Sequence, residues 1–171
     1  MYIKSAHYID LSARAGVSSG EAVALNDHGD AIGANGGLGG TPVLWRADGS
    51  VVTLETLGSG GSYAWSINDA TQIVGWSQPP ITGLPLPADH AVIWNSAGQL
   101  TDINPAGFAS SHAYDISNSG WIVGSCSDSK TSYAVVWMPV PEPGSLCSLA
   151  SGVVALAMVR RSRRLSFARR R

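Results

Sequence analysis

Three aspartates, Asp27, Asp30 and Asp69, have the side-chain type for a metal site, because calcium binds through carboxylate oxygens. They lack the D-x-[DN]-x-[DN]-G spacing and the later glutamate of a calcium loop. Asp27 and Asp69 instead each follow an asparagine, and Asn and Asp side chains bond their own backbone in turns. We therefore expect these residues to form turns, and we predict no metal site.

The other reactive residue types form no recognisable constellation. Zinc-ligand spacing is absent among the four histidines, which are His7, His28, His90 and His112. The glycine-rich stretch 36–40 is not followed by the GK[ST] of a phosphate loop. Cys126 falls in a predicted strand and Cys147 in an apolar run, so they are not a disulfide framework. We predict no cofactor and no catalytic residues.

The C-terminal tail, residues 140–171, has a distinct chemical order. Pro141, Glu142 and Pro143 favour an extended backbone that presents the glutamate to a protease-like cleft. An uncharged run, 146–159, follows; as a helix it would span about 21 Å, which is shorter than a bilayer core of about 30 Å. Bilayer thinning and snorkelling arginines allow such a short span. An arginine-rich end, 160–171, should then hold the C-terminus in the cytoplasm, through Arg160, Arg161, Arg163 and Arg164.

This order resembles the PEP-CTERM sorting signal, on residues 140–164. The resemblance implies recognition by an exosortase-type membrane transpeptidase and cleavage near Pro141-Glu142-Pro143. It also implies an inner-membrane intermediate, held through residues 146–159, followed by delivery to the cell surface or to extracellular polysaccharide. The alternative is a plain membrane anchor that is not cleaved.

Charge is segregated along the chain. Seven of the eleven basic residues lie in the last twelve positions, whereas residues 1–139 carry four basic and eleven acidic side chains. Because nucleic-acid binding depends on cationic neutralisation of phosphates, this acidic body predicts no nucleic-acid partner.

An internal repeat organises the body. Three ungapped stretches align, 22–33, 64–75 and 113–124, and each is followed by a loop and a strand that ends in tryptophan. The recurring residues, which we expect to be structural, are Gly33, Gly75, Gly124, Trp45, Trp94 and Trp137. A glycine inside a strand indicates a close backbone approach or a bulge, and recurring tryptophans indicate packing. The non-recurring tryptophans, Trp65, Trp76 and Trp121, are better candidates for an exposed binding surface.

Each unit reads as four strands, which predicts an all-β domain, 1–139, of propeller-blade-like units. The units lie near 20–57, 62–104 and 111–138, with a partial unit at 2–11 and a proline-rich exposed loop at 78–89. The pattern resembles HAF-type extracellular repeats across residues 2–138, most closely at His90-Ala91-Val92. That resemblance implies an exported, propeller-like protein without a settled activity.

With about three units, two ways of closing the domain are compatible with the sequence. Three suit a β-trefoil, whereas a propeller needs about four to eight blades. The chain starts within a unit and shows no apolar signal-peptide run after Met1. We therefore expect a truncated N-terminus and an incomplete propeller.

Two functions follow. The first is an exported cell-surface or matrix-associated repeat protein without enzymatic activity, with extracellular polysaccharide as a further possible partner. The alternative is a polysaccharide-active hydrolase or lyase, which needs two carboxylates about 5 to 10 Å apart. The acidic residues fall mostly in repeat-equivalent turns, as Asp27 and Asp69 do, and this favours the first function.

Overall fold

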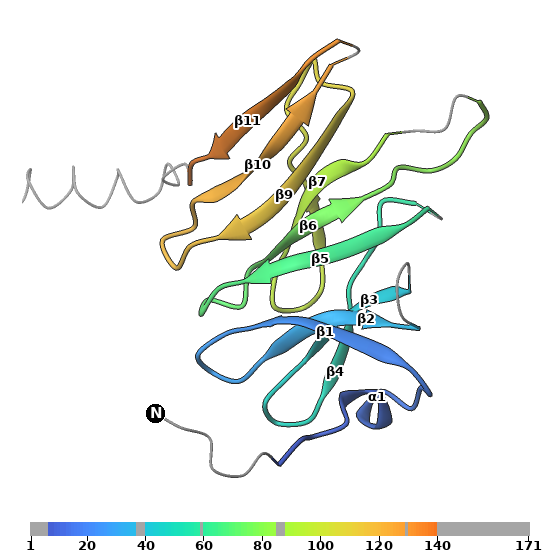
Figure 1. The fold of residues 1–171 in the computed structure, drawn as a ribbon, viewed down its shortest axis with the longest axis vertical. Coiled ribbons are helices and arrows are strands. Elements are labelled where there is room, and N and C mark those ends of the chain that lie inside the picture. The colour runs from blue at the N-terminus through green and yellow to red at the C-terminus, as the bar shows by residue number, and fades with distance from the viewer. Residues whose placement is uncertain (1–6, 37–39, 59, 85–87, 129, 140–171) are drawn as a thin grey trace, which may run out of the picture. The chain divides into compact units, whose positions relative to one another are not determined.

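The computed structural model describes residues 7–36, 40–58, 60–84, 88–128 and 130–139. They form three antiparallel sheets and one short helix, α1 (Leu11–Arg14) (Figure 1). Sheet 1 contains β1 (Gly20–Leu25), β2 (Ala31–Asn35), β3 (Thr41–Trp45) and β4 (Val51–Thr53). Sheet 2 contains β5 (Ser62–Ile67), β6 (Ile73–Ser77), β7 (His90–Trp94) and β8 (Leu100–Asp102). Sheet 3 contains β9 (Ser110–Ile116), β10 (Ile122–Ser127) and β11 (Ser132–Trp137). The all-β prediction is confirmed.

In every sheet the strands pair in chain order, and each described pairing lies within one repeat unit. Sheets 1 and 2 have the four expected strands. Sheet 3 has three within the described residues. The third strand of each sheet ends at its repeat tryptophan, as the sequence predicted.

A bulge recurs in the first strand of each sheet, opposite the repeat glycine. The pairing register shifts between Ala22 and Ala24, and again at the equivalent positions of β5 and β9. A Cβ on Gly33 would lie 1.8 Å from the Glu21 carbonyl oxygen, and one on Gly75 would lie 1.9 Å from that of Tyr63. On Gly124 it would lie 2.0 Å from the His112 oxygen. The bulged carbonyl therefore occupies the space of a side chain, and only glycine leaves room for it.

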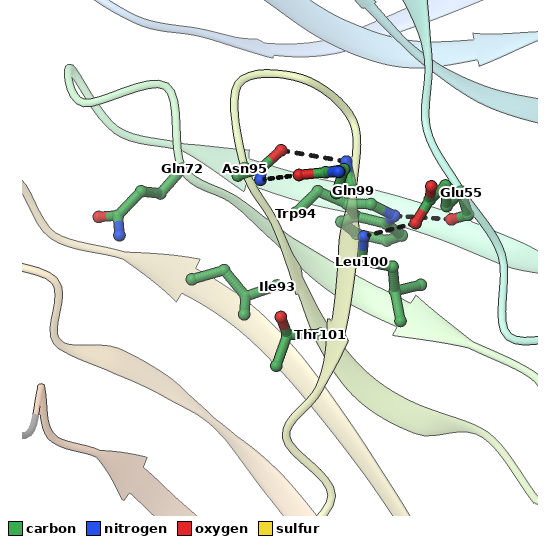
Figure 2. A pocket seen from close by; sticks show the side chains of 8 residues that line it. All are labelled: Glu55, Gln72, Ile93, Trp94, Asn95, Gln99, Leu100 and Thr101. Atoms are coloured by element: carbon green, nitrogen blue, oxygen red, sulfur yellow. Dashed lines mark hydrogen bonds between the residues drawn. The ribbon is translucent and has the colours of Figure 1, made fainter.

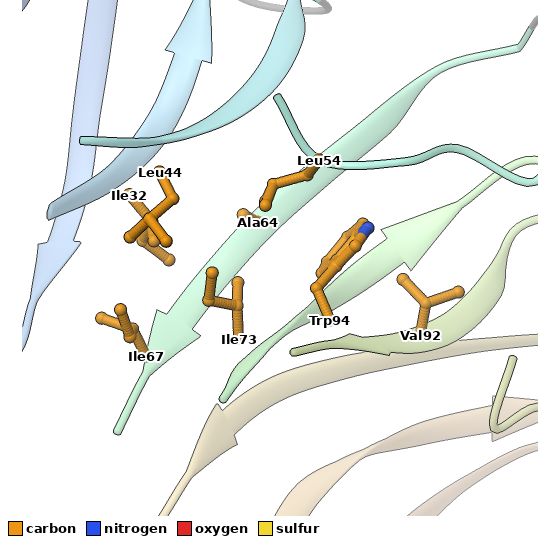
Figure 3. Packing of buried hydrophobic residues seen from close by; sticks show 8 residues of the cluster. All are labelled: Ile32, Leu44, Leu54, Ala64, Ile67, Ile73, Val92 and Trp94. Carbon is orange, nitrogen blue, oxygen red and sulfur yellow. The ribbon is translucent and has the colours of Figure 1, made fainter. Parts of the chain in front are cut away.

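Sheets 1 and 2 pack face to face at a first junction. Its core consists of Ile32, Leu44, Leu54, Ala64, Ile67, Ile73, Val92 and Trp94 (Figure 3). The first three come from sheet 1 or the chain just after β4, and the other five come from sheet 2. Each of these side chains is at most 7% exposed, so the junction is a closed apolar layer.

Sheets 2 and 3 pack at a second junction with a smaller core. Val74 and Ala91 of sheet 2 meet Ala113, Ile116 and Ile122 of sheet 3. Partly buried Ile93, Ile103 and Trp137 complete it. Sheet 2 therefore uses one face for sheet 1 and the other face for sheet 3.

The N-terminal segment differs from the prediction. Residues 2–11 were expected to be the second half of an earlier unit, but the described part contains no strand. The Asp10 carboxylate instead accepts hydrogen bonds from the backbone N–H groups of Ser12 and Ala13, at 3.0 and 3.2 Å. This N-cap begins α1 at Leu11, because it satisfies amide groups that a first helical turn leaves free.

The contacts divide the chain into a unit of residues 1–138 and a unit of residues 139–171, of which only residue 139 is described. The predicted apolar helix, 146–159, lies outside the described residues. Within the described part of the chain, no helix is long and apolar enough to cross a membrane.

Candidate functional site

The sorting residues of the tail cannot be placed. Pro141, Glu142 and Pro143, with Arg160, Arg161, Arg163 and Arg164, all lie outside the described residues. On the described body, the candidate features are the repeat residues, the exposed aromatic side chains and the cavities.

The repeat tryptophans are packing residues in this structure. Trp94 is fully buried, and its indole N–H donates to the Glu55 carbonyl oxygen at 2.7 Å. Trp137 is half-buried and donates in the same way to the Ile103 oxygen at 2.9 Å. Trp45 is 2% exposed. In sheets 2 and 3 the indole thus ties the third strand to the chain that ends the preceding unit.

The repeat Asn-Asp turns connect neighbouring sheets. The Asn26 side-chain amide donates to the Asn68 carbonyl oxygen at 3.3 Å, and the Asp27 backbone N–H donates to Asp69 Oδ1 at 3.0 Å. One unit later, Asn68 donates to the Ser117 oxygen at 3.1 Å and the Asp69 N–H donates to Asn118 Oδ1 at 2.9 Å. The Asn118 amide also donates to Asp69 Oδ2 at 2.6 Å. These carboxylates and amides therefore join successive units.

Asp30 is the third aspartate of the predicted turn set, and it is 8% exposed. Its Oδ1 accepts the Ala47 N–H at 3.0 Å, and its Oδ2 accepts the Thr71 hydroxyl at 3.3 Å. Among the described residues, no group of three or more His, Cys, Asp or Glu side chains could hold a metal ion. Cys126 is buried in β10, and burial raises the pKa of its thiol, so this thiol is a poor nucleophile.

The three non-recurring tryptophans differ in exposure. Trp65 is 40% exposed and Trp121 is 47% exposed, whereas Trp76 is half-buried. Trp65 is the bulged residue of β5, and its ring centroid lies 4.5 Å from that of Tyr63. The Trp76 ring packs edge-on against His112 of sheet 3, at 6.0 Å. Of the three, Trp65 and Trp121 present substantial ring surface to solvent.

Trp65 is one of four aromatic side chains that form two ring pairs, one on the first strand of sheet 2 and one on the first strand of sheet 3, which together we call the aromatic row. We define this row as Tyr63, Trp65, His112 and Tyr114. His112 stacks on Tyr114 with an interplanar angle of 9° and centroids 6.2 Å apart. The two strands are joined where the Ser66 hydroxyl donates to Asp115 Oδ1 at 2.6 Å. The row therefore combines the partly exposed rings of Trp65, His112 and Tyr114 with the buried ring of Tyr63 and with hydrogen-bonding groups.

Polar partners surround the aromatic row. The Tyr63 hydroxyl donates to Glu21 Oε2 at 3.3 Å, and burial, followed by the Glu21 charge, raises the pKa of Tyr63. The Tyr114 hydroxyl bonds with the Ser125 hydroxyl at 2.9 Å, and His112 Nε2 lies 3.3 Å from Asp89 Oδ2. Rings flanked by hydroxyl and carboxylate groups suit a polyhydroxylated ligand.

Sequence reasoning found Trp65 but missed the rest of the row. A signal for Tyr114 was available, since it occupies the same repeat position as Trp65, 49 residues later. The bulge explains its exposure, because a bulged residue has no opposite partner in the neighbouring strand. Tyr63 and His112 also share a repeat position, with the same spacing.

A polar cavity of about 520 Å³ lies beside β7 and β8 (Figure 2). Its lining residues are Glu55, Gln72, Ile93, Trp94, Asn95, Gln99, Leu100 and Thr101. Glu55 is the one carboxylate in this lining, and its Oε2 accepts the Leu100 backbone N–H at 3.0 Å. Asn95 and Gln99 hydrogen-bond each other across the β7–β8 turn, at 2.8 Å. Among the described residues the lining therefore holds one carboxylate, whereas glycoside hydrolysis generally uses a pair.

Residues 139–164 match the model of the PEP-CTERM protein-sorting motif. Neither the curated proteins nor the solved structures include a significant match to the chain. The match confirms the sorting signal that the sequence predicted. It indicates a protein that an exosortase sorts to the cell surface, and its activity there is a separate question.

Proposed function

We propose that the chain is an exported cell-surface or matrix-associated β-repeat protein whose body binds without catalysing a reaction. The observation that carries the proposal is the sorting motif at residues 139–164, attached to a body of repeated antiparallel sheets. In this proposal the exosortase cuts near Pro141-Glu142-Pro143, and the arginine-rich end stays with the removed peptide. The acidic body is then released from the membrane intermediate.

We further propose that the three sheets are successive blades of a propeller-like array of HAF-type repeats. Pairing in chain order within each sheet, with sheets packed face to face, supports blades. A β-trefoil would instead require strands of different units to share one barrel. The described pairings join strands of the same unit only.

Sorting is tested by expressing the chain with a fused signal peptide in cells with and without an exosortase. We expect a loss of mass and release from the membrane only where the enzyme is present. Pro141→Ala with Pro143→Ala should abolish both changes. The matched control, Pro79→Ala with Pro80→Ala in the exposed loop, should leave them intact. Membrane retention at full mass in the presence of the enzyme would instead identify an uncleaved anchor.

We propose the aromatic row as the ligand-binding surface of the body, with a neutral polysaccharide as its ligand. Trp65 and Tyr114 are 40% and 49% exposed, and ring faces stack on sugar rings. The net charge of residues 1–139, about −7, disfavours an anionic polymer.

Affinity electrophoresis in gels containing dextran or soluble β-glucan tests this proposal. Trp65→Ala with Tyr114→Ala should weaken retardation about tenfold, which corresponds to about 1.4 kcal/mol. Trp121→Ala is the matched control, because Trp121 is comparably exposed but lies outside the row. Equal retardation of all variants would refute the row as the binding surface. Hydrolysis of either polymer would support the enzymatic alternative.

A further inference from the structure

Several residues that the two internal junctions bury are exposed at the two ends of the stack of sheets, although Val43 and Trp45 of sheet 1 stay buried, at 0% and 2% exposure. Val123 of β10 occupies the repeat position of Ile32 and Val74, which are both 0% exposed, yet Val123 is 45% exposed. Val136 of β11 occupies the position of Leu44, which is 0% exposed, yet it is 54% exposed. The outer face of sheet 3 is therefore a junction face that has no following sheet among the described residues.

The opposite end shows the complementary face. Leu25 of β1 occupies the repeat position of Ile67 and Ile116, which lie in the two junction cores at 7% and 6% exposure. Leu25 itself is 71% exposed. The outer face of sheet 1 is therefore the face that, in sheets 2 and 3, packs on the preceding sheet.

Polar groups at the two ends of the stack are also complementary, as hydrogen-bond donors and acceptors. Asp69 Oδ1 accepts the Asp27 N–H at the first junction, and Asn118 Oδ1 accepts the Asp69 N–H at the second. If this series continued by one unit, the Asn118 N–H would be the next donor. The Asp27 carboxylate is the equivalent acceptor at the other end, and it has no partner among the described residues. The Trp45 indole nitrogen is likewise buried without a described partner, whereas Trp94 and Trp137 donate to the preceding unit.

The two ends of the stack also correspond in their fourth strands: the position beside β11 holds no described strand, and a segment before sheet 1 has the spacing of one. In the described chain β11 pairs only with β10, whereas β3 and β7 each have a fourth strand beside them. Prolines at 139, 141 and 143 cannot donate to such a pairing. Residues 8–11 correspond by spacing to β4 with Leu54, yet Tyr8 and Ile9 are 91% and 66% exposed. They line a cavity of about 260 Å³ beside Trp45, which is where a preceding unit would end.

We propose that a second copy of this chain docks head to tail, with the outer face of its sheet 1 on the outer face of sheet 3. The occupant is specified by the two internal junctions, which already join these same faces with these same residue positions. Such a contact is heterologous, so copies associate into a closed ring or an open chain rather than a face-to-face pair. Its centre brings Leu25 of one copy to Val123 and Val136 of the other.

The test measures the protein mass of the full-length chain in mild detergent by light scattering coupled to size-exclusion chromatography. We expect a multimer at tens of micromolar. Val123→Asp with Val136→Asp should reduce it to a monomer, and so should Leu25→Asp on the other face. These side chains are exposed, so circular dichroism should show an unchanged fold. Leu84→Asp, at an 89% exposed loop position, is the control that should remain a multimer.

Mixing the two monomeric variants identifies the head-to-tail contact, because together they hold one intact copy of each face. The mixture should form a dimer and nothing larger. A monomeric wild type, or association that persists in both variants and so arises elsewhere, would overturn the proposal. So would a dimer that Leu25→Asp leaves intact, because it would show sheet 3 packed on sheet 3.

Discussion

The first junction, between sheets 1 and 2, and the second junction, between sheets 2 and 3, are built from the same repeat positions but differ in closure. Eight side chains form the buried core of the first, including Trp94 at 0% exposure. The buried core of the second has five, and its tryptophan, Trp137, is only half-buried. Polar cross-links join both junctions: Tyr63 donates to Glu21 and Thr71 to Asp30 at the first. At the second, Ser66 donates to Asp115, and hydrogen bonds run in both directions between Asp69 and Asn118.

The difference shows that residues at the same repeat position can be buried to different extents. Sheet 2 lies between two sheets, so both of its faces exclude water. Sheet 3 has one neighbour and three described strands, so its tryptophan and outer valines stay accessible. Since apolar stabilisation follows the area removed from water, the second junction should be the weaker one.

The largest expected effect compares the junction tryptophans. Trp94→Ala should lower the free energy of unfolding by about 3–5 kcal/mol, because it leaves a cavity in a closed core. Trp137→Ala should cost only about 1–3 kcal/mol, because its indole is partly hydrated already. Urea denaturation of the full-length chain in mild detergent, followed by far-UV circular dichroism, measures both. Equal losses would show that the two junctions are equally closed.

Two glycine substitutions compare the cost of a steric clash within a sheet with the cost of backbone strain in a turn. Gly75→Ala should destabilise the fold by about 1–3 kcal/mol or more, because the added Cβ meets the Tyr63 oxygen in a packed sheet. Gly49→Ala is the comparison: this glycine has φ +92° in a turn with open space around it, so only backbone strain of about 1 kcal/mol applies. The same denaturation assay ranks the two variants. A larger loss at Gly49 would contradict the close-approach argument.

Asp27 and Asp69 occupy the same repeat position, but their substitution by alanine should change the free energy of unfolding by different amounts. Asp69→Ala removes the acceptor of two hydrogen bonds, from the Asp27 N–H and the Asn118 amide, and should cost about 1–3 kcal/mol. In the monomeric chain, Asp27→Ala should be nearly neutral, because its carboxylate makes no hydrogen bond within the described residues. Unfolding midpoints in urea compare the pair at a concentration too low for association. If Asp27→Ala costs as much there, the Asp27 carboxylate has a partner within its own chain.

The smallest expected effect is the pH dependence conferred by Tyr63. Burial raises its folded-state pKa above the ordinary 10.0, and the Glu21 carboxylate adds to the effect. Its contribution to stability is therefore complete below pH 10 and is lost as the pH rises toward the folded-state pKa, since the unfolded chain ionises first. Tyr63→Phe should flatten the decline of stability above pH 10. An unchanged decline in the variant would place its origin in other groups.

The repeat made much of the fold predictable. Trp45, Trp94 and Trp137 end third strands, and Gly33, Gly75 and Gly124 lie opposite a bulged strand, as their spacing indicated. The segment 8–11 was not predictable in this way. Its spacing matches a fourth strand, but the Asp10 cap begins a helix there, and a strand needs a paired neighbour to satisfy its backbone.

The candidate site was predicted only in part. Trp65 was singled out because it does not recur, yet its ring partner Tyr63 and the equivalent pair, His112 and Tyr114, were not. Each ring pair lies within one strand, two residues apart. What the sequence does not show is that β5 and β9, which carry the two pairs, are joined by the Ser66–Asp115 hydrogen bond.

The sequence by itself determined the sorting signal and the repeat, because both are local. A proline-bounded glutamate, an apolar run and an arginine cluster act in order along the chain, and a strand that ends in tryptophan needs only its own unit. The tertiary structure decided which equivalent residues are buried, which aspartate links two sheets and which aromatic rings meet. These properties depend on which segment covers a face of a sheet, and the spacing of a repeat does not specify that.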